Sequence, residues 1–314
     1  MDRFILIDGN AIMHRAFHAL PALSNKSGEL TNAVYGFFSM FLKITEDLEP
    51  TYIAVCFDRP KPTFRKALYA GYQASRPKMS DDLSPQIGIT HSILNTIGIQ
   101  IFEVDGYEAD DLIGTLSKQI VQQARDSKIE VIIVSGDRDL LQLVNAHVRM
   151  LAPLVGMTKM QMYDEESVFH KYGIYPSQIV DYKALVGDSS DNYPGVTGIG
   201  PKTAKELLTQ YQTFENLYNH ISEVSVKTAH MLAQDAEQAA LAKKLATIVI
   251  DAPISLNLQM CDLHNFDKNK ARKVFKENGF KSLCDRLKTE EDTSEEVKKI
   301  NNKTAKGSEQ LGLL

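Results

Sequence analysis

The chain has 314 residues, of which 43% are hydrophobic and 24% are charged, with a formal net charge of −5. These values are those of an ordinary globular protein with room for about two domains. No apolar run is long enough to span a membrane and the first residues lead straight into a predicted strand, so we expect neither an anchor nor a signal peptide. The three cysteines, Cys56, Cys261 and Cys284, lack metal-ligand spacing, which indicates free thiols in a reducing cytoplasm. The net acidity does not favour nucleic-acid binding, but a whole-chain charge conceals local basic patches.

Predicted strands and helices alternate through the first half of the chain. Short apolar runs bounded by turn residues predict strands over 3–8, 51–58, 100–104, 130–136, 148–153 and 159–163. Apolar residues at helical spacing predict helices between them, over 11–20, 32–48, 81–97 and 112–124. Such alternation predicts an α/β domain with a mainly parallel central sheet flanked by helices. The ligands of such sheets lie at the carboxyl ends of the strands.

Carboxylates recur where these strands end. They are Asp8, Asp58, Glu108, Asp110, Asp111, Asp137 and Asp139. Acids in the first turn of a helix are also favoured by the helix dipole, so residues 108–111 alone have a plain structural explanation. Carboxylates gathered at one sheet edge repel each other and need cations, and their oxygen ligands suit Mg²⁺ or Mn²⁺. The recurrence at several strand ends favours a metal site.

Residues 59–80 differ in character from their surroundings. They contain no acid but six basic residues, with aromatic residues between them: Arg59, Lys61, Arg65, Lys66, Arg76 and Lys78, and Phe64, Tyr69 and Tyr72. A solvated basic face would have the same composition. Basic residues interleaved with aromatic ones also suit phosphate contact and base stacking on a single strand. Three prolines and a glycine disfavour a core helix, so we expect a mobile crossover above the sheet edge.

Strand signals end near residue 163 and helical patterns follow. We therefore expect an α/β domain over 1–163 and a helical subdomain over 164–287. The remaining residues, 288–314, are polar and charged, which predicts a disordered tail or linker. Two further acids, Asp188 and Asp191, lie in a polar loop after a predicted helix.

A glycine-rich turn follows that loop, near residues 195–211. Gly198, Ile199 and Gly200 precede a predicted helix, with Lys202 in its first turn. Glycines let backbone amides point outward at a helix start, which makes a cradle for phosphate or a cation. A tight turn between two helices would look the same, and Lys202 favours the phosphate alternative.

Five motifs occur together in one order, and their combination is specific. They are Asp8-Gly9-Asn10, Phe57-Asp58, Tyr107-Glu108-Ala109-Asp110-Asp111, Ser135-Gly136-Asp137-Arg138-Asp139-Leu140 and Gly187-Asp188-Ser189-Ser190-Asp191-Asn192. From Asp2 to about Leu287 the chain resembles the 5′-nuclease family of flap endonuclease-like enzymes, in particular the 5′→3′ exonuclease domains at the N-terminus of bacterial DNA polymerase I. The resemblance implies a PIN-like fold and a structure-specific phosphodiesterase that removes flaps or primers in DNA replication and repair.

The resemblance also implies two Mg²⁺ ions, for which Mn²⁺ can substitute. By matching position, Asp8, Asp58, Glu108 and Asp110 would hold the first ion. The second would lie at Asp137, Asp139, Asp188 and Asp191, with Asp111 as an additional or outer acid. Two such ions can activate water and stabilise both the attacking and the leaving oxygen.

Residues for DNA contact follow from the same matching. The segment 59–80 resembles the arch over the active site, in which Arg65, Lys66, Tyr72 and Arg76 would contact DNA. Residues Arg15, Lys66 and Arg76 would assist catalysis near the scissile phosphate. Residues Gly198, Gly200 and Lys202 resemble a helix-hairpin-helix within a helix–three-turn–helix, often with K⁺, and Lys183 would contact the duplex. The implied partner is branched or flapped DNA with a 5′ end, bound by a monomer in the bacterial cytoplasm or nucleoid.

One position departs from the family pattern. Many relatives have a lysine after the arch tyrosine, whereas this chain has Gln73, which can donate a hydrogen bond but supplies no charge. Residues Lys66, Lys78 and Arg76 are the candidates to compensate. The polymerase domains that follow in relatives would act in cis or in trans, and the sequence leaves open whether the nuclease stands alone.

Three other functions are compatible with parts of this sequence pattern. A phosphotransferase or phosphatase with an aspartate nucleophile needs far fewer acids and no helical hairpin. A non-catalytic DNA-binding module would be favoured by loss of a key acid, but all nine positions are filled. An RNA-directed nuclease of related architecture remains the alternative, since only the resemblance favours DNA.

Overall fold

A six-stranded sheet forms the centre of the protein. The computed structural model describes residues 2–123, 129–156 and 159–287. The strands are β1 (Asp2–Asp8), β2 (Tyr52–Cys56), β3 (Gln100–Phe102), β4 (Ile129–Val134), β5 (Val148–Val155) and β6 (Lys159–Tyr163), in the order β3-β2-β1-β4-β5-β6. All neighbours pair in parallel except β5 with β6, which pair antiparallel. The predicted mainly parallel sheet is confirmed, and every predicted strand overlaps an observed one.

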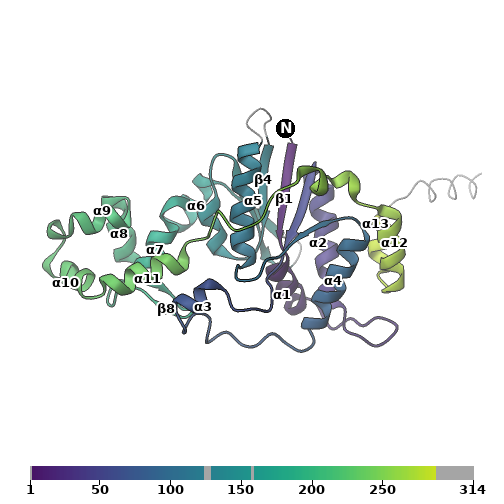
Figure 1. Cartoon of the computed structure of the whole chain (residues 1–314), viewed down its shortest axis with the longest axis horizontal. Helices are drawn as coiled ribbons and strands as arrows, with labels where there is room; N and C mark the ends of the chain where they lie inside the picture. The colour runs from purple at the N-terminus through teal and green to yellow at the C-terminus, as the bar shows by residue number, and fades with distance from the viewer. Residues whose placement is uncertain (1, 124–128, 157–158, 288–314) are drawn as a thin grey trace, which may run out of the picture.

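Helices cover both faces of this sheet (Figure 1). The helix α5 (Ala109–Gln123) packs on one face, and α1 (Gly9–Ala19), α2 (Asn32–Leu48) and α4 (Ser84–Thr96) lie on the other. Alternate residues of β1 enter opposite cores, because successive side chains of a strand point to opposite faces. Phe4 and Leu6 belong to the cluster with α5, whereas Ile5 and Ile7 belong to the cluster with α2. This two-sided burial explains why the central strands are continuous apolar runs.

The second half of the chain is mostly helical and extends to one side of the sheet (Figure 1). Its helices are α6 (Glu165–Tyr172), α7 (Ile179–Val186), α8 (Pro201–Tyr211), α9 (Phe214–Asn219), α10 (Val226–Gln234) and α11 (Ala236–Ala246). Short 3₁₀ turns are η1 (Arg138–Leu143), η2 (Pro176–Gln178), η3 (Ile221–Glu223), η4 (Leu258–Cys261) and η5 (Leu263–Asn265). The expectation that no strand follows residue 163 is wrong at one place. There, β7 (Gly187–Asp188) and β8 (Tyr193–Pro194) form an antiparallel pair, too short to leave a periodic signal in the sequence.

The last two helices return to the sheet. Helices α12 (Lys268–Glu277) and α13 (Lys281–Arg286) pack near α4 and α2, and the Phe38 and Phe275 ring centroids are 5.2 Å apart. The division into 1–163 and 164–287 remains a proposal, and residues 268–287 complete the core of the first part. The predicted tail, 288–314, lies outside the described residues. Among the described helices, none combines the length and apolar character needed to cross a membrane.

The basic segment 59–80 crosses the sheet edge where the strands end (Figure 1). It contains one short helix, α3 (Phe64–Leu68), followed by turns up to residue 76. A chain over the carboxyl ends of the strands is what the sequence predicted for this segment. Its side chains can therefore reach the carboxylates below.

We expect Gly187→Ala to lower the free energy of unfolding by at least about 2 kcal/mol. Gly187 has φ 79° and ψ −176°, a region that only glycine adopts readily, and an added Cβ would lie 2.4 Å from the Gly195 nitrogen. The matched control is Gly88→Ala in α4, where an added Cβ meets nothing within 4 Å. We expect that control to stabilise by about 0.5–1 kcal/mol. Urea unfolding measures both, and equal effects would contradict the close β7–β8 approach.

Candidate active site

Three acids of the sheet edge accept hydrogen bonds from backbone amides at the starts of helices. Asp8 caps α1, with Oδ1 accepting from the Ala11 amide at 2.9 Å. Asp58 Oδ1 accepts from the Ala109 amide at the start of α5, at 2.7 Å. Asp137 caps η1 through the Asp139 amide, at 2.9 Å. One oxygen of each carboxylate is thus fixed in place by an amide that the helix leaves unpaired.

A serine joins the ends of the two central strands. Ser135 Oγ donates to Asp8 Oδ2 at 2.6 Å and accepts from the Asp137 amide at 2.9 Å. Ser135 lies within one of the five motifs, but the sequence alone predicts no role for it. Its small side chain directly after an apolar strand was the available signal. It holds two carboxylates from neighbouring strands in a fixed relation.

The carboxylates of this edge are close enough to perturb one another. Burial, together with the charges of Asp58 and Asp137, raises the pKa of Asp8 to about 7. Burial raises the pKa of Glu108 to about 7 as well, against the opposing effect of Arg65. The pKa of Asp110 lies well above its ordinary value, because burial and nearby carboxylates disfavour its charged form. The side chains around these carboxylates therefore do not supply enough positive charge to balance them.

A second group of acids adjoins the first. Asp139, Asp188 and Asp191 each offer a carboxylate oxygen, and these atoms lie within 4.8 Å of one another. Burial raises the pKa of Asp139 to about 6. Asp188 and Asp191 come from the β7–β8 hairpin, so the helical part of the chain completes a site that the sheet begins.

Lys183 lies inside this second group, in contrast to the duplex contact that the sequence predicted. Its ammonium donates to both Asp139 and Asp188, and its side chain is only 14% exposed. Burial would raise the pKa of Asp188, but Lys183 and Ser190 lower it to about 2. This ammonium lies between two carboxylates and supplies positive charge that a metal ion would otherwise supply.

The surroundings of a buried tyrosine hydroxyl indicate whether these acids can bind a hydrated metal ion. The Tyr193 hydroxyl is buried and has no hydrogen-bond partner among the described residues. The carboxylates of Asp139, Asp188 and Asp191 face it closely enough to raise its pKa further, after burial itself. A buried polar group without a partner costs free energy, which an ordered water would remove. Carboxylate oxygens, together with a buried hydroxyl that a bound water would satisfy, fit Mg²⁺ or Mn²⁺.

The arch contacts the carboxylates directly. Arg76 Nη2 lies 2.5 Å from Asp191 Oδ1, and the Gln73 amide donates to the Asp191 carbonyl at 2.8 Å. The Tyr72 hydroxyl lies 3.1 Å from Glu108 Oε2 and 3.3 Å from Asp191 Oδ2. Tyr72 is 3% exposed, so it belongs to the core of this contact, and the expected DNA contact of its ring is not available.

Arg65 and Asp111 form an internal ion pair. Arg65 Nη1 and Nη2 donate to Asp111 at 2.7 and 2.8 Å, and Arg65 also donates to the carbonyls of Leu245 and Thr247. Asp111 in turn accepts from the Val249 amide at 2.9 Å. Both side chains are buried in this ion pair, and the predicted roles of Arg65 toward DNA and of Asp111 toward a metal remain predictions. Arg65 Nη1 also lies 3.3 Å from Glu108 Oε2, so the pair supports a site carboxylate.

The nine predicted acids thus gather at one edge, and Asp111 differs from the other eight in its buried ion pair with Arg65. The comparison with known proteins decides the family. A family model described as "5′-3′ exonuclease, N-terminal resolvase-like domain" matches residues 3–173, more than half of the chain. A second, "5′-3′ exonuclease, C-terminal SAM fold", matches residues 174–269. The chain belongs to the 5′–3′ exonuclease family. This confirms the resemblance that the five motifs carried.

Relatives of this chain include longer proteins. The chain is 41% identical over 306 residues to DNA polymerase I of Bacillus subtilis, covering 96% of this chain and 34% of that protein. It is 43% identical over 299 residues to DNA polymerase I of Bacillus caldotenax, covering 95% and 33%. The chain therefore spans about a third of the length of these curated relatives.

Solved structures share the fold of this exonuclease. A structure titled "Divalent metal ions (zinc) bound to T5 5′-exonuclease" matches 91% of this chain and 100% of that one, with a TM-score of 0.65 and 17% identity. The catalytic core of Rad2 in complex with DNA substrate matches 91% and 92%, with a TM-score of 0.56 and 14% identity. At these identities the likeness concerns the fold alone, and it confirms the predicted fold class.

The remaining predicted residues of the exonuclease lie apart from the acids. Arg15 Nε donates to the Gly156 carbonyl at 2.8 Å, and within the described ranges Arg15 makes no ion pair with the carboxylates. Gly198 has φ 85°, and Gly200 caps α8. The Lys202 side chain is 91% exposed and its nearest acid, Glu206, is 4.0 Å away. The glycine turn thus lies in the helical part, with a free basic group beside it.

We expect Arg65→Ala to destabilise the exonuclease by about 3–5 kcal/mol, because Asp111 would remain buried without its partner. Guanidinium unfolding with two variants checks this, the matched control being the neighbouring exposed residue in Lys66→Ala. That control should change stability by less than about 0.5 kcal/mol. A stable Arg65→Ala protein with weakened DNA binding would restore the sequence-based role of Arg65.

Proposed function

We propose that this chain is a divalent-metal-dependent nuclease that hydrolyses DNA from 5′ ends and at 5′ flaps. The observation that carries the proposal is the convergence of eight carboxylates at one sheet edge, under an arch that presents Arg76. Membership of the 5′–3′ exonuclease family supports the same reaction. Such a concentration of like charge has no structural purpose of its own, because it destabilises the metal-free protein.

Two groups of residues would hold the metals. Asp8, Asp58, Glu108 and Asp110 form the group on the sheet, and Asp137, Asp139, Asp188 and Asp191 form the group that the β7–β8 hairpin completes. Bound Mg²⁺, or Mn²⁺ in its place, would supply the positive charge that the attacking water and the leaving oxygen require. The chain's own part is to fix Asp8, Asp58 and Asp137 through Ser135 and the helix amides.

Arg76 is the basic group best placed for the scissile phosphate. Its guanidinium touches Asp191, and its side chain is 48% exposed, so it faces both the acids and the solvent. An incoming phosphate would compete with Asp191 for this guanidinium, which donates several hydrogen bonds in a fixed fork. Lys66 and Arg15 remain proposals as assisting groups, and Gln73 supplies no charge.

The helical part would hold the duplex. Backbone amides at the Gly198–Gly200 turn and the exposed Lys202 suit successive phosphates, with K⁺ as a further candidate ligand of the turn. The proposed substrate is therefore branched DNA, with the duplex on the helical part and the 5′ strand under the arch. Action as a monomer in the bacterial cytoplasm, with polymerase domains in cis or in trans, belongs to the same proposal.

We expect Glu108→Gln to reduce Mg²⁺-dependent cleavage of a labelled 5′ flap by at least about a hundredfold. Its melting temperature without metal should equal or exceed that of the wild type, because one repelling charge is gone. The matched control is Glu166→Gln on α6, an acid whose side chain is 82% exposed and remote from the cluster. A Glu108→Gln enzyme that cuts at the wild-type rate, or a wild type fully active in chelator, would sink the metal assignment.

We expect Lys202→Ala to weaken binding of duplex-containing substrates more than binding of short single strands. The slope of log affinity against log salt should fall by about one, the effect of one lost phosphate contact. Fluorescence anisotropy in chelator, over a series of salt concentrations, measures this without cleavage. Lys244→Ala, which removes a lysine from α11, serves as the comparison. An unchanged slope in Lys202→Ala would mean that the glycine turn only joins two helices.

A further inference from the structure

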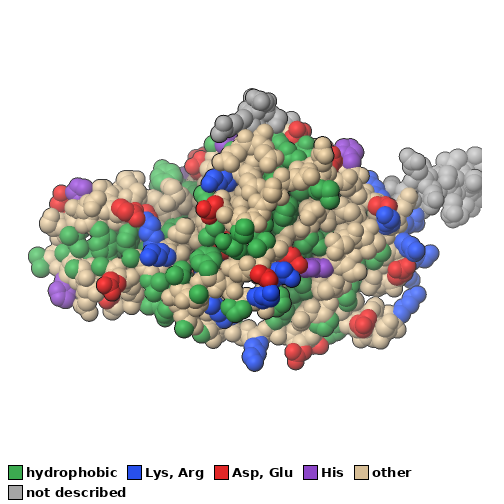
Figure 2. Space-filling view, viewed as in Figure 1, with side chains coloured by type: hydrophobic (Ala, Val, Ile, Leu, Met, Phe, Trp, Pro, Cys, Tyr) green, Lys and Arg blue, Asp and Glu red, His purple; other side chains and the backbone are tan. Residues whose placement is uncertain are grey.

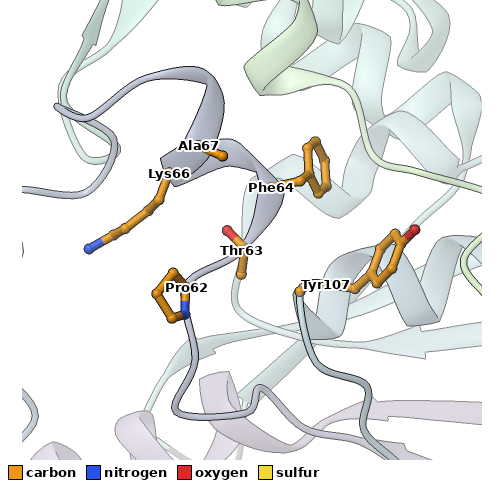
Figure 3. A pocket seen from close by; sticks show the side chains of 7 residues that line it. Pro62, Thr63, Phe64, Lys66, Ala67 and Tyr107 are labelled. Carbon is orange, nitrogen blue, oxygen red and sulfur yellow. The ribbon is translucent and has the colours of Figure 1, made fainter.

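A cavity of about 520 Å³ lies between the start of the arch and the turn that precedes α5 (Figure 3). Its walls include Pro62, Phe64 and Tyr107, with Thr63 and Lys66 beside them. The Phe64 and Tyr107 ring centroids are 6.1 Å apart, with the planes inclined at 54°. In Figure 3 these two rings lie on one side, and the Lys66 side chain extends outward on the other. The volume falls in the range of about 300–1,000 Å³ that is usual for ligand pockets.

The cavity shares its structure with the proposed active site. Thr63 Oγ1 donates to Glu108 Oε1 at 3.0 Å, and Tyr107 directly precedes Glu108 in the sequence. The Phe64 amide donates to the Gly106 carbonyl at 3.1 Å, which fixes the arch to this turn. A ligand in the cavity would therefore contact Thr63, whose hydroxyl donates to a carboxylate of the site. These contacts join neighbouring segments, so a ligand could bind in the cavity without movement of distant elements.

The charges around the cavity leave one ammonium free. Basic and acidic side chains lie next to one another on the face shown in Figure 2. Arg59 and Lys61 are both paired with Asp105, and Arg65 is buried with Asp111. Lys66 is exposed, and its ammonium makes no ion pair or hydrogen bond with any residue in the described ranges. Aromatic walls with one uncompensated cation at the rim match a nucleobase and its phosphate.

We propose that this cavity binds one unpaired nucleobase of the 5′ strand, with Lys66 on the adjoining phosphate. The proposal rests on the proposed function and adds a subsite to it. Its consequence is selectivity: a substrate that offers an unpaired base beside the cut gains a contact that a fully paired end does not make. Stacking of one base on an aromatic side chain contributes about 1–3 kcal/mol.

The test pairs a protein change with a DNA change. The full chain, as wild type and as Phe64→Leu, is titrated in chelator with a 5′ flap that carries either a normal or an abasic unpaired nucleotide next to the duplex. We expect Phe64→Leu to bind the normal flap about 5- to 150-fold more weakly, which corresponds to the free energy of one stacked base. On the abasic flap the two proteins should bind equally, because the partner of Phe64 is gone.

Two further variants keep the outcome decisive. Tyr107→Leu should give the same pattern as Phe64→Leu, whereas Phe169→Ala, an exposed aromatic on α6, should bind both flaps like the wild type. Circular dichroism and melting temperatures verify that each variant is folded. Equal losses on the normal and abasic flaps would overturn the subsite. Failure of the wild type to cut any DNA in Mg²⁺ would instead overturn the proposed function, so the two failures are distinguishable.

Discussion

Repulsion among the carboxylates at the carboxyl edge of the sheet is the constraint on which the rest of this structure depends. Parallel strands place their ends at one edge, so acids that follow β1, β2 and β4 must meet there. Nearby hydrogen-bond donors hold these carboxylates, namely the amides of Ala11 and Ala109 and the hydroxyl of Ser135. These donors hold the carboxylates in place without neutralising them, which preserves the field that would attract cations.

Positive charge reaches this edge from elements far apart in the sequence. Arg76 comes from the arch, and Lys183 comes from α7 in the helical part. Arg65 ties the arch to α5 and to the chain after α11 through Asp111 and the Thr247 carbonyl. The arch, the sheet and the helical part are therefore joined by one network of charges. A proposed substrate strand would enter that network where it is exposed, at Arg76, and would also meet the exposed Lys66, which lies outside the network.

Two neighbouring residues of the arch show what the sequence can and cannot predict. Arg65 and Lys66 are adjacent and were given the same DNA-binding role, yet one is buried in an ion pair and the other is exposed. Composition identifies a basic segment but cannot assign directions to its side chains, because α3 turns successive residues to different sides. The same holds for Tyr72, whose ring lies in the core of the contact between the arch and the β7–β8 hairpin.

The sequence by itself determined the α/β alternation, the position of acids at strand ends and the family, because each depends on local periodicity or on motif order. Only the tertiary structure decided which charges pair, since Arg65 meets Asp111 46 residues away and the Thr247 carbonyl 182 residues away. It alone paired β7 with β8, left the Tyr193 hydroxyl without a partner among the residues that the structure describes, and shaped the Phe64–Tyr107 cavity. Such contacts depend on packing between distant segments, which carries no periodic signal along the chain.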